Sequence, residues 1–541
     1  MRSLLLAFGS RFLVLLLTAL GALALAFGFV DLPEDRDAFA LVLVPVVFFC
    51  GLGLHDIFQT RHAVLRNYPI VGHLRYLLEN IRPELRQYFF EADTDSTPYS
   101  RESRGLVYQR AKRSLGVRPF GTQQDVYRSA HEWIHHSIAP KPVAHENFRI
   151  SIGGPQCAQP YSASVLNISA LSYGAISTNA ILALNKGAKL GGFAHDTGEG
   201  SVSPYHRTHG GDLIWEIGSS YFGCRHLDGT FAPETFAALA VDPQIKMIEL
   251  KLSQGAKPGH GGILPGAKVT REVAAIWGVE AGKDSVSPAG HSTFSTPVEM
   301  MRFIGELRRL SGGKPTGFKL CVGHPWEFFA LIKAMRETDI LPDFIVIDGS
   351  EGGTGAAPLE FLDHVGSPLR DALAFVHSAL VGANLREHIR IGCSGKVASA
   401  FDMARLLALG ADWCNAARGF MFALGCIQAQ QCHSGRCPTG VATQDPLRTR
   451  GLVVGDKAQR VFGFHQETLK ALAELISAAG LNHPSELQAV HLMLRTSDNR
   501  VTTFADQYPC MAPGELLSGG GVHAQDWDCA SADTFERVRR A

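Results

Sequence analysis

Short runs rich in β-branched and aromatic residues alternate with longer helix-like stretches through the middle of the chain, and each run ends in glycine, serine or a charged residue. The expected strands are SVLNISAL (164–171), GFAHDTG (192–198), KMIELKLS (246–253), DSVSP (284–288), GFKLCVG (317–323), DFIVIDG (343–349), IRIGCSG (389–395) and DWCNAAR (412–418). Eight strands in about 250 residues predict an α/β fold, the TIM or (β/α)8 barrel, whose functional groups gather at the C-terminal ends of the strands.

A doubly wound sheet is the main structural alternative to the barrel. It normally carries a Gly-x-Gly-x-x-Gly turn after an early strand, and the sequence has none. We therefore expect a barrel over residues 151–475, an α-rich collar before it over residues 61–150, and a C-terminal extension over residues 476–541 that wraps the barrel or stays mobile.

The N-terminus carries two long apolar runs. Residues 12–30 contain no charge, residues 38–54 form a second run, and the acidic segment DLPEDRD separates them. Arginines stand before the first run and after the second: Arg2, Arg11, Arg61 and Arg66. Because positive residues favour the cytoplasmic side, residues 1–60 predict a transmembrane helical hairpin in the inner membrane, with both ends and the catalytic domain in the cytoplasm.

Two other interpretations of the apolar runs remain. A cleaved signal peptide would fit Arg2 and the small residues Ala22, Ala24 and Ala26, but the first run is longer than a usual signal core and a second run follows it. A buried helical hairpin of a soluble domain would normally show a polar face, and neither run has one.

Composition excludes some functions. Lys+Arg and Asp+Glu are equal at 51 each, so the chain lacks the basic excess of a nucleic-acid-binding protein. Eleven cysteines in 541 residues are too few for a disulfide scaffold. Several of them fall close together, which favours reactive or metal-binding thiols.

Three cysteines form the clearest chemical motif. In GCIQAQQCHSGRCPTGVATQ, Cys426, Cys432 and Cys437 have the spacing Cys-x5-Cys-x4-Cys. Three thiolates from one loop can hold an iron–sulfur cluster. The same loop could hold zinc with His433 as a fourth ligand, or its thiols could be buried without any ligand.

Glycine-rich loops and lysines follow several of the expected strands. DGSEGGTGAAP (348–358), IGCSGKV (391–397) and NAARGFMFALG (415–425) stand where barrels bind phosphate. Lys319 ends the strand in GFKLCVG, where a buried cation could stabilise negative charge on a reduced flavin or serve in a structural salt bridge. Lys257 and Lys268 stand in QGAKPGHGGILPGAKV, a loop typical of lids and binding sites.

Together these stretches resemble the FMN-binding synthase domain of glutamate synthases and its small stand-alone bacterial relatives. The resemblance covers about residues 167–473 and rests on ALSYGAIS (170–177), DTGEG (196–200), QGAKPGHGGILPG (254–266), DGSEGGTGAAP and the cysteine loop. It implies a TIM barrel with FMN and a three-iron, four-sulfur (3Fe-4S) cluster on the three cysteines.

The resemblance also assigns roles to single residues. It implies flavin contacts for Ser172 and Lys319, and contacts to the phosphate tail for Gly353, Gly355, Gly395, Arg418 and Gly419. Glu199 would handle protons or the amino group, and Lys257 would bind a carboxylate. The implied reaction is the reduction of 2-iminoglutarate, formed from 2-oxoglutarate and ammonia.

This chain departs from the family pattern where the substrate is expected to bind. The family loop usually reads KPGEGGQLPG, and this chain has His260 for the acidic residue and Ile263 for the glutamine. Apolar sequence around Trp277 replaces an expected arginine, and an apolar group cannot grip a carboxylate as arginine does. A less acidic keto acid or imine is therefore an open alternative.

The 541 residues contain neither the amidotransferase half of a full glutamate synthase nor a dinucleotide fold for NADPH. We therefore expect free ammonia as the nitrogen source and a ferredoxin-like protein or membrane carrier as the electron donor. The alternative from another class is a membrane-associated electron-transfer flavoprotein that does not turn over a keto acid.

Overall fold

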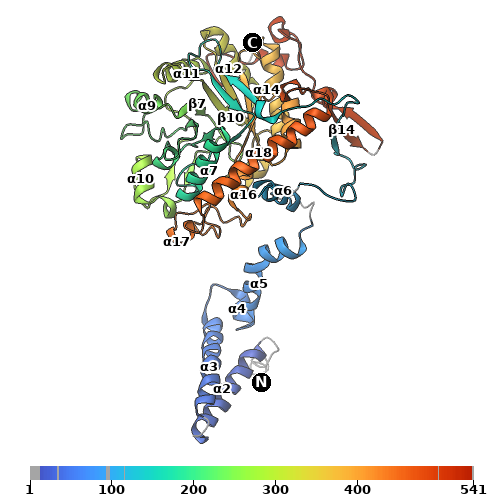
Figure 1. Ribbon diagram of the computed structural model, residues 1–541. Coiled ribbons are helices and arrows are strands. Elements are labelled where there is room, and N and C mark those ends of the chain that lie inside the picture. Colours follow the sequence, from blue (N-terminus) through green and yellow to red (C-terminus); the bar gives the residue numbers. More distant parts are fainter. Residues whose placement is uncertain (1–11, 33–35, 93–97, 115, 498, 539–541) are drawn as a thin grey trace. The chain divides into compact units, whose positions relative to one another are not determined.

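Eight short parallel strands, buried on both faces, form the core of the computed structural model. The strands are β4 (Leu166–Ile168), β5 (His195–Asp196), β6 (Leu213–Ile217), β7 (Ile245–Lys251), β10 (Thr316–Leu320), β11 (Phe344–Asp348), β12 (Arg390–Ser394) and β13 (Trp413–Ala416). Each pairs with the next, and β13 pairs with β4, so the sheet closes into a barrel (Figure 1). The predicted TIM barrel is confirmed.

The structure describes residues 12–32, 36–92, 98–114, 116–497 and 499–538. Contacts divide the chain into two units, residues 1–93 and 94–541. The segment 61–150, expected as one collar, therefore contributes to both units. In the second unit it supplies α6 (Arg101–Ala111), the strand β1 (Glu132–Ile134) and a 3-10 turn, η4 (His145–Asn147).

One expected strand is wrong, and one barrel strand was not expected. DSVSP forms β9 (Ser285–Val286), which pairs antiparallel with β8 (Ile263–Leu264) outside the barrel. The third barrel strand is instead β6, with the sequence LIWEI. The charged Glu216 interrupts this short apolar run, while the alternation in DSVSP imitates a half-buried strand.

Helices surround the barrel in the order that a (β/α)8 fold requires. After the successive strands come α7 (Thr178–Gly191), α8 (Pro204–Arg207), α9 (Pro233–Ala240), α11 (Pro297–Leu310), α12 (Pro325–Thr338), α13 (Leu359–His364) with α14 (Leu369–Gly382), α15 (Ala400–Ala408) and α16 (Arg418–Leu424). Local signals set the ends of several helices: the Ser177 side chain caps α7, and Gly192, in the left-handed region, ends it.

The longest insertion, residues 252–296, follows the fourth strand, β7. It contains β8, β9, a 3-10 turn, η5 (Gly266–Lys268), and α10 (Arg271–Trp277). Asp348, at the end of β11, fixes the start of this insertion by accepting a hydrogen bond from the Gly255 amide at 2.7 Å. A Cβ on Gly255 would lie 1.8 Å from the Gly349 carbonyl oxygen, so only glycine permits this close approach.

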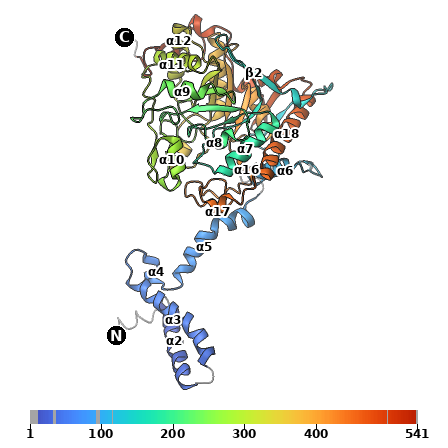
Figure 2. The same ribbon diagram turned by 60° about the vertical axis from the view of Figure 1, so that its left-hand side comes forward.

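The residues after the barrel pack on it. α17 (Pro446–Thr449) precedes the long α18 (Val454–Ala478), which lies alongside α7 and α6 in both ribbon views (Figures 1 and 2). β14 (Leu492–Ser497) joins β1 and β15 (Arg500–Thr503) in a three-stranded sheet. The other elements here are η6 (Pro484–Glu486), η7 (Ala489–His491), α19 (Phe504–Gln507), η8 (Glu515–Ser518) and α20 (Ala524–Asp528); β2 (Arg149–Ile152) and β3 (Tyr161–Ser164) form a hairpin before β4.

The first unit is helical. α2 (Leu13–Asp31) and α3 (Arg36–Phe58) lie side by side, and α4 (Ala63–Asn67), α5 (Gly72–Leu85) and the π-helical turn η3 (Arg86–Phe90) follow. Both long helices, with mean hydropathies of 2.6 and 2.3, could cross a membrane by length and composition, as core helices of soluble proteins and signal sequences also could. Arg2 and Arg11 lie outside the described residues.

Candidate active site

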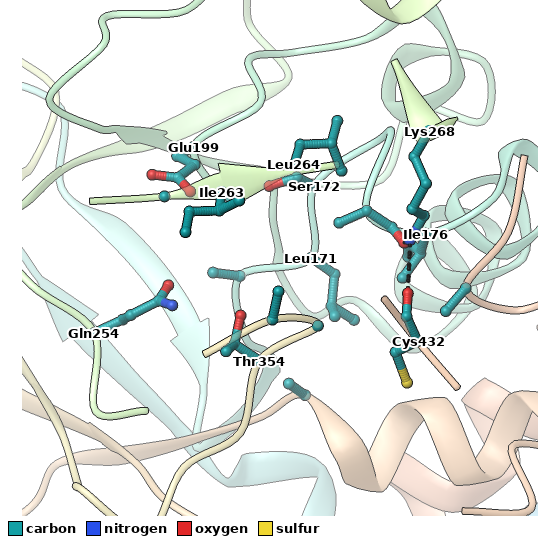
Figure 3. A pocket seen from close by; sticks show the side chains of 18 of the residues that line it. Leu171, Ser172, Ile176, Glu199, Gln254, Ile263, Leu264, Lys268, Thr354 and Cys432 are labelled. Atoms are coloured by element: carbon teal, nitrogen blue, oxygen red, sulfur yellow. Dashed lines mark hydrogen bonds between the residues drawn. The ribbon is translucent and has the colours of Figure 1, made fainter. Parts of the chain in front are cut away.

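A cavity lies at the C-terminal ends of the barrel strands. Loops after β4, β5, β7, β11 and β13 and the insertion at 252–296 line it. It brings together seven of the residues expected from the sequence: Ser172, Glu199, Lys257, Gly353, Gly355, Arg418 and Cys432. In Figure 3, Glu199 and Ile263 lie at one end of the cavity, and Lys268 and Cys432 lie at the other.

The carboxylate of Glu199 is held between two backbone segments and a lysine. A Cβ on Gly262 would lie 2.1 Å from Glu199 Oε1, and a Cβ on Gly218 would lie 2.9 Å from Glu199 Cβ. Lys251 Nζ lies 3.0 Å from Glu199 Oε2. Glu199 is therefore a confined carboxylate that is paired with an ammonium at the cavity wall.

Lys251 also connects Glu199 with its surroundings. Its ammonium donates to Gln254 Oε1 at 2.9 Å and lies 4.0 Å from Glu216 Oε1. All four side chains line the cavity. The sequence analysis missed Lys251, Gln254 and Glu216 as site residues. Lys251 stands near the end of the expected strand KMIELKLS, as Lys319 stands within GFKLCVG, and a lysine in an otherwise apolar strand is the signal that could have found it.

Lys319 is fully buried and does not line the cavity. Its ammonium donates to Glu216, which does line it, and lies 3.4 Å from Glu249 Oε1. Burial opposes the charged amine, but Glu216, Glu249 and Asp196 outweigh it and raise the pKa of Lys319. The flavin-ring role of Lys319 stays a prediction.

The carboxyl groups of Asp196, Glu216 and Glu249 surround Lys319, and their pKa values shift in different directions. Burial raises the pKa of Asp196 to about 7 and that of Glu249 well above its usual range. For Glu216, burial is outweighed by Lys319 and Lys251, which lower its pKa. The directions of these pKa shifts favour the ionised form of Glu216, as the partner of Lys319, and the protonated form of Glu249. The three carboxyl groups have oxygen atoms within 4.8 Å of one another, close enough to bind one metal ion. The Lys319 ammonium pairs with Glu216 there and supplies the positive charge.

Lys257 is the most isolated charge in the cavity. Its side chain is 2% exposed, and it has no hydrogen bond or ion pair with another described residue. Burial lowers its pKa to about 8, although Glu199 nearby acts in the opposite direction. A buried ammonium without a partner is favourable next to an anion, which agrees with the predicted carboxylate-binding role of Lys257; that role stays a prediction.

Arg418 joins the glycine-rich loop to the cysteine loop. Its guanidinium donates to the Thr354 carbonyl at 3.0 Å and lies 3.6 Å from Cys432 Sγ. Gly353 lies against the same guanidinium, and a Cβ on Gly355 would meet open space. The loop thus presents backbone to the cavity at a cationic wall, which suits an anionic ligand.

Gly395 and Gly419 do not line the cavity. A Cβ on Gly395 would lie 3.0 Å from Leu369, and one on Gly419 would lie 3.1 Å from the Val397 carbonyl oxygen and 3.2 Å from Phe464. In this structure both glycines permit close packing of the loops after β12 and β13. Their predicted phosphate contacts remain predictions.

The three cysteines lie in one loop between Arg418, Lys268 and α6. Lys268 donates to the Cys432 carbonyl at 3.1 Å, and Tyr108 of α6 donates to the Cys426 carbonyl at 2.6 Å. The three sulfur atoms do not all lie within 4.8 Å of one another, as the ligands of one metal ion would. His433 is exposed. The loop does not form a compact zinc site.

The surroundings of Cys437 lower its pKa and so favour its thiolate form. Burial disfavours the charged form, but hydrogen bonds from the Thr439 hydroxyl and from the amides of Ala442, Thr439 and Val441 outweigh burial and lower its pKa. Amide donors to a cysteine sulfur are a feature of iron–sulfur ligands. The donor set therefore fits the expected cluster.

Comparison with known proteins identifies the family. A family model described as a conserved region in glutamate synthase matches residues 142–482, more than half of the chain. The chain belongs to the glutamate synthase family. It is accordingly an oxidoreductase, and the matched region contains the whole barrel and the cysteine loop.

Two relatives show how far the family similarity extends. The chain is 38% identical to glutamate synthase large subunit-like protein YerD of Bacillus subtilis, over 85% of this chain and 95% of that protein. It is 34% identical to the archaeal NADPH glutamate synthase of Methanocaldococcus jannaschii, over 61% of each chain. A flavocytochrome b2 mutant with pyruvate bound matches 81% of this chain and 89% of its own, with a TM-score of 0.40 and 13% identity. The closed eight-stranded barrel itself shows the fold.

Proposed function

We propose that this glutamate synthase family member is an FMN and iron–sulfur oxidoreductase that reductively aminates a 2-oxo acid with ammonia and electrons from an external donor. One observation carries the proposal: a single cavity has the Glu199–Lys251 pair and Lys257 at one end and Cys432, beside Arg418, at the other. Acid–base groups and the cysteine loop expected to hold an iron–sulfur cluster therefore share one site.

The residues present fit both cofactors. Ser172 and the Gly353–Gly355 loop offer polar and backbone groups at the cavity wall, with Arg418 as a cation for an anionic tail. Cys426, Cys432 and Cys437 would hold the cluster, and Cys437, whose sulfur lies 3.5 Å from the Thr439 hydroxyl, has a lowered pKa. When bound, FMN would supply hydride to an imine carbon, and the cluster would supply electrons to FMN.

The protein's own groups would bind the substrate and manage its protons. Lys257 would hold the substrate carboxylate. Glu199, kept in place by Lys251, would accept a hydrogen bond from ammonia or the imine nitrogen and exchange protons with it. The 2-oxo acid and ammonia form the imine with loss of water, and the imine then takes up two electrons and two protons to give the amino acid.

We also propose that α2 and α3 anchor the enzyme in the inner membrane with the barrel in the cytoplasm. Their hydropathies and lengths support this, as does the absence of any buried residue in α2. A ferredoxin-like protein or a membrane carrier would then donate the electrons.

Stopped-flow reoxidation of the reduced holoprotein tests the proposed function. We expect a 2-oxo acid together with ammonia to accelerate reoxidation of the flavin under anaerobic conditions, and neither compound alone to do so. If no member of a panel of 2-oxo acids has this effect, the proposed amination is wrong, and a membrane-associated electron-transfer flavoprotein becomes the better account.

A further inference from the structure

The cationic side chains that line the cavity differ in what they already bind. Lys251 is paired with Glu199 and Gln254. Lys268 donates to two backbone carbonyls, those of Ala175 and Cys432. Arg418 binds the Thr354 carbonyl and lies on Cys432. Among the described residues around the cavity, Lys257 alone of these cations has no partner.

Among the described charged side chains that line the Glu199 end of the cavity, Lys257 alone has no partner of opposite charge; Asp196 and Glu249 do not line the cavity and lie beside Glu216 and Lys319. Glu199 matches Lys251, and Glu216 matches Lys319. Lys257 remains as one uncompensated positive charge, and one carboxylate neutralises it. A second carboxylate at this end would be a buried anion without a cation, which is strongly unfavourable.

The walls next to this charge are apolar. Ile263 lies beside Glu199 in Figure 3, and Leu264 follows it in β8. Trp277 is 4% exposed, with its ring stacked on Phe222 at a centroid distance of 4.6 Å. A Cβ on Gly200 would lie 2.8 Å from the Trp277 ring, so the ring is packed tightly against the DTGEG loop.

The neutral polar groups of the cavity do not replace a cation. Ser285 and Ser287 offer hydroxyls, and the Gln254 amide oxygen is already bound to Lys251. Hydroxyl donors are weaker partners for a carboxylate than an ammonium or guanidinium is. They suit a carbonyl or an imine nitrogen better than a second buried carboxylate.

We infer that the substrate is a 2-oxo or 2-imino monocarboxylate with an apolar side chain, and not a dicarboxylate. Lys257 takes its carboxylate, and Ile263, Leu264 and Trp277 face its side chain. This inference rests on the proposed function above and names its substrate class; Ile263 is the specificity-determining position.

Two ligands of equal shape test the inference. In 5-methyl-2-oxohexanoate, an isopropyl group replaces the distal carboxylate of 2-oxoglutarate. Each is titrated into the oxidised full-length holoprotein, and the perturbation of the flavin absorbance gives Kd. We expect the apolar isostere to bind at least about tenfold more tightly, because 2-oxoglutarate must bury an unpaired charge.

A charge-introducing variant gives an independent readout. Ile263→Arg should supply the missing cation and shift the preference toward 2-oxoglutarate by about tenfold or more. Val286, on the neighbouring strand β9, is 64% exposed and does not line the cavity. Val286→Arg is therefore the matched control, with the same added charge, and should leave the preference unchanged.

The outcomes separate this inference from the proposed function. Tighter binding of the isostere, reversed by Ile263→Arg and not by Val286→Arg, supports the inference. Tighter binding of 2-oxoglutarate by the unaltered protein, with flavin reoxidation by 2-oxoglutarate and ammonia, overturns the inference and leaves the proposed function standing. If neither ligand perturbs the flavin and neither reoxidises it with ammonia, both are wrong.

Discussion

Glu199 has little freedom to move inside the cavity. The backbones of Gly218 and Gly262 confine its side chain, and Lys251 binds its carboxylate. The sequence motif DTGEG indicates an acid here, but the residues that restrain it come from β7, from the loop after β6 and from the insertion. Its position is therefore set by one strand and two loops together.

Gly262→Ala should displace this carboxylate. The added Cβ would meet Glu199 Oε1 at 2.1 Å, so the side chain must shift away from its present position. Because misplacing a catalytic group by about 1 Å can cost about 100-fold in rate, we expect kcat to fall by about 10- to 100-fold with flavin and iron contents unchanged. Gly290→Ala, at an exposed glycine whose Cβ would meet nothing within 4 Å, is the control. Equal activity of both variants would show that Glu199 does not act from this position.

Substrate binding should depend on the protonation of Lys257. Its pKa is lowered to about 8, so the ammonium is present below that pH and is lost as pH rises through it. We expect kcat/KM for an anionic 2-oxo acid to be level below pH 7 and to decline above pH 8, by up to about tenfold per pH unit. The measurement is the pH dependence of kcat/KM, which reports the pKa values of groups in the free enzyme. A level profile from pH 7 to pH 9.5 would exclude Lys257 as the carboxylate-binding group.

At the scale of elements, seven of the eight barrel strands follow from sequence, because buried parallel strands read as short apolar runs between helical patterns. β6 was not expected, although β7, which carries the buried Glu249, was; the short run LIWEI of β6 contains the buried Glu216. That residue is tolerated there only because Lys319, on a strand that is not its sequence neighbour, neutralises it. A contact between distant segments of the chain cannot be read from a local pattern.

The same limit explains why only some residues of the candidate site could be predicted: local motifs do not show which distant segments come together. Glycines and cysteines in short motifs indicate the loops that line the cavity, and the cavity contains Ser172, Glu199, Lys257 and Cys432 as expected. Lys251 and Gln254 carry no motif, and they become site residues only because β7 and the insertion fold over the barrel.

Glu216 and Glu249 should respond differently to the same substitution. They lie opposite each other on β6 and β7. Glu216→Gln removes the charge that pairs with buried Lys319 and should lower the free energy of unfolding by about 3 kcal/mol. Glu249→Gln replaces a neutral acid with a neutral amide and should change it by about 1 kcal/mol or less. Denaturant unfolding of the two variants compares them, and a larger loss for Glu249→Gln would contradict the assigned protonation states.

The cysteine loop gives a test of cluster ligation. Cys432→Ala removes one of three sulfurs and should abolish the visible iron–sulfur absorption and lower the iron content. Cys510, an exposed cysteine outside the loop, provides the control: Cys510→Ala should keep both. Unchanged iron in Cys432→Ala would mean that this cysteine is not a ligand.

At the scale of the whole molecule, two units with different chemistry occur in one chain. Leu13–Asp31 and Arg36–Phe58 form two apolar helices, and the unit of residues 94–541 contains the barrel with its own core. We expect the full chain to stay in the membrane fraction after a high-salt wash, and a chain of residues 94–541 to be soluble with its cofactors bound. A C-terminal reporter should be active in the cytoplasm. Release of the full chain by salt, or a reporter active only in the periplasm, would contradict the proposed anchor and its orientation.

We propose that one cavity serves both a flavin and a three-iron cluster. The most direct test is a flavin, iron and sulfide analysis of the detergent-purified full chain, together with its optical spectrum. We expect close to one FMN and about three irons per chain, because a cluster held by three cysteines implies three irons. Flavin without iron, or zinc in place of iron, would contradict it and would show that the barrel has kept the fold of its family without the redox path.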